Sequence, residues 1–143
     1  VKKIKMLKKG FKSLIKNPLI FFNSNIQSLK FHFDMHHGDG NLDKAISCLN
    51  DNDRVDFKEY MIKNISFHPH IMFITKPNIA EKWFSDLFTW LFKCEKIFGF
   101  ENLKGYETTR LYAYLAERYL SFWFTKYTKY KNLSWVFCDM SEK

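Results

Sequence analysis

The sequence is poor in the residues that break regular structure and in those that form covalent cross-links. Its 143 residues include only five Gly and three Pro. That is too few for the many turns of an all-β sandwich, so long helices are favoured. Cys48, Cys94 and Cys138 are widely spaced and predict neither a disulfide framework nor a paired metal-ligand motif, but reduced thiols packed as small apolar groups. Aromatic residues, by contrast, make up 19% of the chain, which predicts one domain with a substantial core.

Acidic residues are missing from residues 1–30, which carry eight lysines. The other 15 basic residues are balanced by 15 acidic ones, so the net charge of +8 belongs to this segment alone. A body without excess positive charge argues against nucleic-acid binding. No apolar run is long enough to span a bilayer, and lysines interleaved with apolar residues do not form a secretory signal.

Residues 1–30 are therefore treated as a basic segment, and residues 31–143 as the folded body. The spacing of apolar residues predicts an amphipathic helix over 3–16 that ends at Asn17-Pro18. Its apolar face is formed by Ile4, Leu7, Phe11, Leu14 and Ile15. Such a helix, followed by Phe21 and Phe22, suits the surface of an anionic membrane. The alternative is a solvated linker, or a helix that docks on another part of the protein.

The body has the pattern of an α+β domain that is predominantly helical. We expect a loop over 31–40, a helix from Asn41, a turn at 51–53 and a short helix over 55–61. A buried strand is expected at 70–75 and a short strand at 135–138. Between them, long helices are expected at 78–98 and 108–126. The first of these should begin with a capping box of Asn78 and Glu81 and stop at Gly99.

Three groups of polar residues are candidates for chemistry. The predicted loop holds His32, Asp34, His36, His37 and Asp39, which could bind Mn²⁺ or Mg²⁺, bind a diphosphate, donate a proton, or have no chemical role. His68 and His70 flank Pro69 before the first predicted strand, where a hydrogen-bonded structural role is the alternative.

The third group lies on the last long helix. Arg110, Tyr114, Glu117 and Ser121 recur at helical spacing, with Arg118 beside them and Glu107 one turn before. The alternative here is a solvated face or an internal ion pair. A calcium loop ending at Glu59 is excluded, because Asp53 falls where Gly is required and Cys48 where the first Asp is required; a capped surface helix is expected instead.

Several stretches resemble blocks of bacterial capsular-polysaccharide and O-antigen glycosyltransferases. They are FHPHIMFITK at 67–76, LFTWLFKCEK at 87–96 and GYETTRLYAYLAERYL at 105–120. His36 or His37, followed by NLDKA from Asn41, is similar to a further block. The resemblance implies the C-terminal half of a GT-A-like domain that moves a hexose, such as galactose, from a nucleotide sugar to a lipid-linked glycan. It also implies a divalent cation, Mn²⁺ or Mg²⁺, whose ligands are not identifiable in this chain.

The same resemblance nominates the site residues. Glu107 and Glu117 would be the catalytic carboxylates, and the substrate would be bound by His36, His37, His70, Arg110 and Arg118. The implied location is the inner face of the cytoplasmic membrane, where the protein would be peripheral. Because the family's N-terminal half has no counterpart here, the alternative is a non-catalytic remnant or a membrane-docking module that assists a partner glycosyltransferase.

Overall fold

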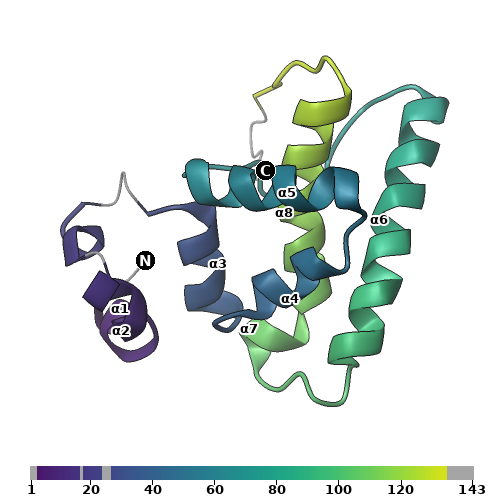
Figure 1. The fold of residues 1–143 in the computed structure, drawn as a ribbon. Coiled ribbons are helices and arrows are strands. Elements are labelled where there is room, and N and C mark those ends of the chain that lie inside the picture. Colours follow the sequence, from purple (N-terminus) through teal and green to yellow (C-terminus); the bar gives the residue numbers. More distant parts are fainter. Residues whose placement is uncertain (1–2, 17, 24–26, 135–143) are drawn as a thin grey trace, which may run out of the picture.

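The computed structural model describes residues 3–16, 18–23 and 27–134, and their regular elements are all helical. Figure 1 shows the arrangement, in which two long helices lie side by side and shorter helices cover them. The helices are α1 (Lys3–Lys9), α2 (Phe11–Lys16), the 3₁₀ turn η1 (Pro18–Phe21), α3 (Leu29–His37), α4 (Asn41–Ser47), α5 (Asp51–Lys63), α6 (Pro77–Phe98), α7 (Tyr106–Thr109) and α8 (Leu111–Tyr127).

The expected α+β, GT-A-like class is wrong, because no strand occurs within the described ranges. The stretch 70–75 is an irregular part of the connection between α5 and α6. Ile74 there is 94% exposed, so the apolar run that resembled a buried strand is not buried. A strand needs a neighbouring strand to satisfy its backbone groups, and the described chain offers none. The second expected strand, at 135–138, lies outside the described residues.

The core is built around α6 and α8, which pack against each other in opposite directions (Figure 1). The hydroxyl of Tyr112, early in α8, donates to the carbonyl of Gly99 at the end of α6, and the indole of Trp123, late in α8, donates to Asp86. Helices α3, α4 and α5 close the core from the other side. Trp90 of α6 reaches α4, where its indole donates to the carbonyl of Ala45 at 2.7 Å. Large aromatic side chains therefore fill the interior, as the composition predicted.

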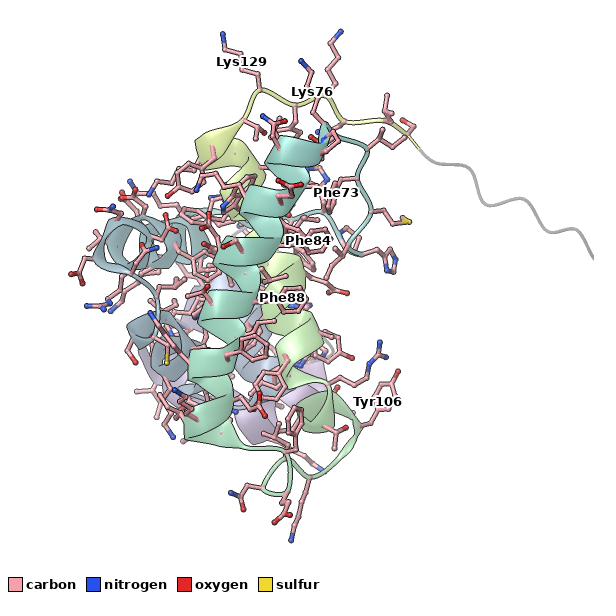
Figure 2. The ribbon with its side chains drawn as sticks, turned by 90° about the vertical axis from the view of Figure 1, so that its right-hand side faces the viewer. Phe73, Lys76, Phe84, Phe88, Tyr106 and Lys129 are labelled. Carbon is pink, nitrogen blue, oxygen red and sulfur yellow. The ribbon has the colours of Figure 1, made fainter. Side chains whose placement is uncertain are left out.

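Helix α6 confirms the expected stop at Gly99 but not the expected start. It begins at Pro77, with Lys76 as N-cap and no side-chain cap bond, so the capping box of Asn78 and Glu81 is wrong. Proline at the first helical position has no N–H to satisfy, which favours this earlier start. Figure 2 shows Phe84 and Phe88 in a row along α6, near Phe73.

Helix α3 replaces the loop expected over 31–40. The Ser28 hydroxyl caps it by accepting from the Phe31 amide. Its buried side chains form two rows, and each row packs against a different part of the protein. The row of Leu29, Phe33 and His37 faces the main core, whereas Phe31 and Met35 contact the N-terminal segment. Because Phe31 and Met35 add a second apolar row to that of Leu29 and Phe33, the sequence lacks the single apolar stripe by which a surface helix is recognised.

Helix α5 begins at Asp51, so the turn expected at 51–53 is its first turn. Asn50 caps it by accepting from the Asp53 amide, which confirms a capped helix. Asp53 itself is 1% exposed and accepts from Tyr119 and Tyr127 of α8, while Lys126 contacts it at 2.8 Å. This buried carboxylate joins α5 to α8.

The N-terminal segment forms two short helices in place of the single one expected over 3–16. Gly10 separates α1 from α2, consistent with the low helix propensity of glycine. The segment packs on α3 through Leu14, Ile20 and Phe21, which contact Phe31 and Met35. In Figure 1 it stands beside α3, apart from the α6–α8 pair.

Candidate functional site

The end of α3 and the short helix α7 are joined by two histidines. The Nδ1 atom of His36 lies 3.3 Å from a carboxylate oxygen of Glu107, and Nδ1 of His37 lies 2.9 Å from the backbone carbonyl of the same residue. A carbonyl only accepts, so His37 carries its proton on Nδ1 and a lone pair on Nε2. Glu107 is thus contacted through both its backbone and its side chain.

A stack of side chains extends this contact to the start of α8. The ring of His37 lies on Tyr114 with centroids 3.9 Å apart and an angle of 22°. The guanidinium of Arg110 lies 5.5 Å from the centroids of both Tyr114 and Tyr106, and Arg110 donates to the Tyr106 hydroxyl at 2.8 Å. Arg110 is exposed, and Figure 2 shows Tyr106 projecting from the surface. The stack holds a cation at the surface beside the two histidines.

The other end of the cluster is a buried arginine. Arg118 is 3% exposed and donates to Glu117 at 3.0 Å. Its second terminal nitrogen lies 3.4 Å from Nδ1 of His32, and its guanidinium lies 3.8 Å from the ring centroid of Phe67. The Nε atom is buried without a hydrogen-bond partner. Arg118 therefore orients Glu117 and His32 from behind the surface of the cluster.

Burial keeps two of the histidines neutral. It lowers the pKa of His32 to about 4, with positive charge on His36 and Arg118 acting in the same direction. Burial also lowers the pKa of His37 to about 4, against the opposing effect of its hydrogen bond to the Glu107 carbonyl. The pKa of Arg118 falls to about 10 because it is buried, although Glu117 favours its charged form. At neutral pH both imidazoles thus act as hydrogen-bonding groups without charge.

The structure joins six of the seven predicted site residues. His32 stacks on His36 with centroids 4.6 Å apart, which links the arginine end of the cluster to the Glu107 end. We call this group the His–Arg–Glu cluster, and it consists of His32, His36, His37, Glu107, Arg110, Tyr114, Glu117 and Arg118. It draws on α3 and on the consecutive helices α7 and α8, and about 70 residues of chain separate α3 from α7.

His70 lies elsewhere, in the connection between α5 and α6. It is exposed and has a φ of 72°, which is uncommon for a residue other than glycine. In the same connection, the backbone amide of His68 donates to the Ser121 hydroxyl at 2.9 Å. The backbone of this connection is thus joined to α8 through Ser121, while the His68 ring lies edge-on to Tyr130 with centroids 6.0 Å apart.

Two members of the cluster were not chosen as site residues from the sequence. His32 was grouped with the predicted loop, and its spacing of four from His36 becomes informative only once the segment is known to be helical. Tyr114 was placed on the polar stripe of α8, but its role as the surface on which His37 stacks depends on a contact between distant segments. Phe67, beneath the Arg118 guanidinium, carried no signal beyond its aromatic ring.

A family model described as a domain of unknown function (DUF4422) matches residues 3–129. The chain belongs to the DUF4422 family. The matched range includes the basic N-terminal segment as well as the cluster, so both are parts of the family's domain. No curated protein and no solved structure matches this DUF4422 chain. The family's description assigns no activity, so the resemblance to glycosyltransferases stays a prediction.

The expected divalent cation has no ligand set in the described part of the DUF4422 chain. No group of three or more His, Cys, Asp or Glu side chains is placed there to hold a metal ion. Within the cluster, the imidazole nitrogens already face Glu107, a backbone carbonyl and Arg118.

Proposed function

We propose that this chain takes part in transferring a hexose from a nucleotide sugar to a lipid-linked glycan at the inner face of the cytoplasmic membrane. The observation that carries the proposal is the contact between two blocks of the resemblance: His36 and His37, from the first, meet Glu107 of the block at 105–120. The cluster also combines a surface cation, carboxylates and neutral imidazoles, the groups that sugar-phosphate chemistry uses.

Arg110 is the group proposed to bind the donor. Its guanidinium is exposed and is supported on one side by Tyr106 and Tyr114, so several N–H groups stay available to phosphate oxygens. Such a fork also stabilises the charge that collects on the departing nucleoside diphosphate.

Glu107 and Glu117 are the carboxylates proposed to act on the acceptor. As the acceptor oxygen bonds to the anomeric carbon, the bond from that carbon to the diphosphate breaks, and the acceptor's proton passes to a carboxylate. Glu107 is held by His36, and Glu117 is held by Arg118, which acts as a positioning residue because it is buried. His37, stacked on Tyr114, positions α7 through the Glu107 carbonyl.

The experiment is incubation of the full chain with a panel of nucleotide sugars, with and without Mn²⁺ or Mg²⁺, while donor binding and nucleotide release are measured. We expect Arg110→Gln to weaken donor binding by about 10- to 100-fold, the worth of one charge-assisted contact. Arg54→Gln is the matched control, because Arg54 is also exposed and pairs with Asp51 on α5. The absence of binding with every donor, or an equal loss in the Arg54 variant, contradicts the proposal.

A second candidate function is a membrane-docking module that assists a partner glycosyltransferase. The observation that favours it is the exposure of Leu7, Phe11 and Phe22 in a segment whose sequence is rich in lysine. The two functions differ in turnover, because a docking module releases no nucleotide from any donor. If hexose transfer occurs only when a partner glycosyltransferase is added, the chain is a docking module and not the enzyme.

A further inference from the structure

An open apolar cavity lies on the N-terminal segment. It has a volume of about 280 Å³ and is lined by side chains of α1, α2 and η1 together with the residue that follows. Leu7, Phe11, Ile15 and Phe22 line it and are between 53% and 77% exposed. A contiguous apolar surface of this kind is uncommon on a protein that remains fully in water, and it marks an interaction site.

Contacts with α3 determine which side chains of the N-terminal segment remain exposed. Leu14, Ile20 and Phe21 pack against Phe31 and Met35 of α3. The carbonyl of Ile20 also accepts from the side chain of Gln27 at 3.1 Å. Leu14 and Phe21 form the inner wall of the cavity as well as the anchor, whereas Leu7, Phe11, Ile15 and Phe22 line it and stay exposed.

The charge of the segment indicates the chemistry of its partner. Seven lysines and no acidic residue occur in residues 1–16. Lys3 and Lys8 are exposed. The eighth lysine of the basic segment, Lys30, belongs electrostatically to the body, because Asp34 and Asp43 pair with it. The net positive charge of the sequence is thus concentrated in the segment that carries the apolar cavity.

We propose that α1, α2 and η1 dock on the surface of a bilayer that contains anionic lipids. The lysines would face the anionic headgroups, and the side chains around the cavity would enter the boundary with the acyl chains. No described helix has the length and apolar character needed to cross a membrane, so the contact proposed is with the surface. The surface of an anionic bilayer interacts favourably with both the lysines and the exposed apolar side chains, whereas water solvates only the lysines well.

Docking in this way places the His–Arg–Glu cluster close to the lipid. Helix α3 contacts the segment through Phe31 and Met35, and the same helix carries His32 and His36. An acceptor anchored in the bilayer would then be presented to the cluster one helix away. The docking itself does not depend on the proposed function, since it rests only on residues of the N-terminal segment.

The test is flotation of the full chain with vesicles of equimolar phosphatidylcholine and phosphatidylglycerol, compared with vesicles of phosphatidylcholine alone. We expect the chain to float only with the anionic vesicles. Each lysine near such a surface is worth about fivefold in partitioning, so the double variant Lys3→Gln/Lys8→Gln should bind roughly 25-fold less. Raised salt should weaken binding by the wild-type chain, because exposed charges are screened. The double variant Phe11→Ser/Phe22→Ser should lose binding without a change in net charge.

Controls come from the body of the protein. Phe84→Ser/Phe88→Ser removes two exposed phenylalanines from α6, and Lys58→Gln/Lys104→Gln removes two exposed lysines. Circular dichroism would verify that each variant keeps its helices. Equal binding to neutral vesicles, no binding to either type, or an equal loss in the control variants overturns the proposal. So does self-association of the chain in solution through Phe11 and Phe22, because a second copy is then the partner. Donor binding is measured without vesicles, so either proposal can fail alone.

Discussion

The buried carboxylate of Asp53 is expected to be a major determinant of stability. It accepts from the Tyr119 hydroxyl at 3.0 Å and the Tyr127 hydroxyl at 2.6 Å, and Lys126 lies at 2.8 Å. Replacing Asp53 by Asn removes the charge and one or two of these acceptor positions while keeping the volume. A hydrogen bond to a charged group is worth about 1.5–3 kcal/mol, and Lys126 regains part of its loss from water. Asp53→Asn should therefore lower the free energy of unfolding by about 2–3 kcal/mol, and Asp53→Ala by about 3–5 kcal/mol.

The matched control uses the same lysine. Asp56 also pairs with Lys126 at 2.8 Å, but its side chain is 54% exposed. An exposed ion pair is worth up to about 1 kcal/mol, so Asp56→Asn should cost at most that amount. Urea denaturation followed by circular dichroism measures all three variants. Equal denaturant slopes are needed before the midpoints are compared as free energies.

The same reasoning gives the dependence on pH. Burial raises the pKa of Asp53, but the hydrogen bonds from Lys126, Tyr127 and Tyr119 outweigh it, and the net shift is below the ordinary value of 3.8. The stabilisation from Asp53 is therefore present above pH 3.8 and is lost as the pH falls through the depressed pKa. The reasoning is refuted if Asp53→Asn costs no more than Asp56→Asn, or if it leaves the acid limb of the stability curve unchanged.

Three further predictions concern the neighbourhood of α3. Because the pKa of His37 falls from 6.5 to about 4 in the folded chain, the unfolded chain binds more protons between these values. His37 should thus make the free energy of unfolding rise with pH in that window by about 3 kcal/mol, and His32, whose pKa is also lowered to about 4, should add a similar rise. His37→Phe should therefore remove about half of the total rise in urea titrations. Arg118→Met should raise the pKa of His32 in an NMR titration, since positive charge on Arg118 lowers it. Gly38→Ala should cost about 1–3 kcal/mol in thermal melts, because Gly38 has a φ of 101° and an added Cβ would lie 2.6 Å from the Asn41 amide nitrogen.

Each of these has a control in the same region. His36→Phe should leave much of the rise of the unfolding free energy with pH, because burial still lowers the pKa of His37 in that variant. Lys126→Met, which removes a cation outside the cluster, should leave the pKa of His32 unchanged. Gly40→Ala shares a positive φ of 79° but has open space around the added Cβ, so Gly38→Ala should cost more. If both variants lose the same free energy of unfolding, the loss comes from backbone strain alone and the contact with Asn41 contributes nothing.

The sequence predicted the long helices well and the short, two-sided elements poorly. Residues 78–98 and 108–126 were placed close to α6 and α8, because a long helix with many apolar positions has a strong period. The stretch 70–75 has the composition of a strand, but strand formation depends on a partner elsewhere in the chain. Similarly, α3 has apolar residues on two sides, and its helical character depends on the contacts that both sides make.

The candidate site was predictable residue by residue but not as an arrangement. The resemblance nominated His36, His37, Glu107, Arg110, Glu117 and Arg118 without any geometry. Sequence spacing alone could not place Arg118 behind the surface, because that depends on contacts with Phe67 and His32 from distant segments. The cation expected from the resemblance found no ligand set among the described residues.

Helix α3 has almost no position left that can vary freely. Leu29, Phe33 and His37 face the core, and Phe31 and Met35 hold the N-terminal segment. Of the positions that remain, Lys30 and Asp34 pair with each other, while His32 and His36 stack within the cluster. When sequences of other DUF4422 members are aligned, this nine-residue helix should therefore drift more slowly than the solvent-facing side of α6, although α6 is much longer.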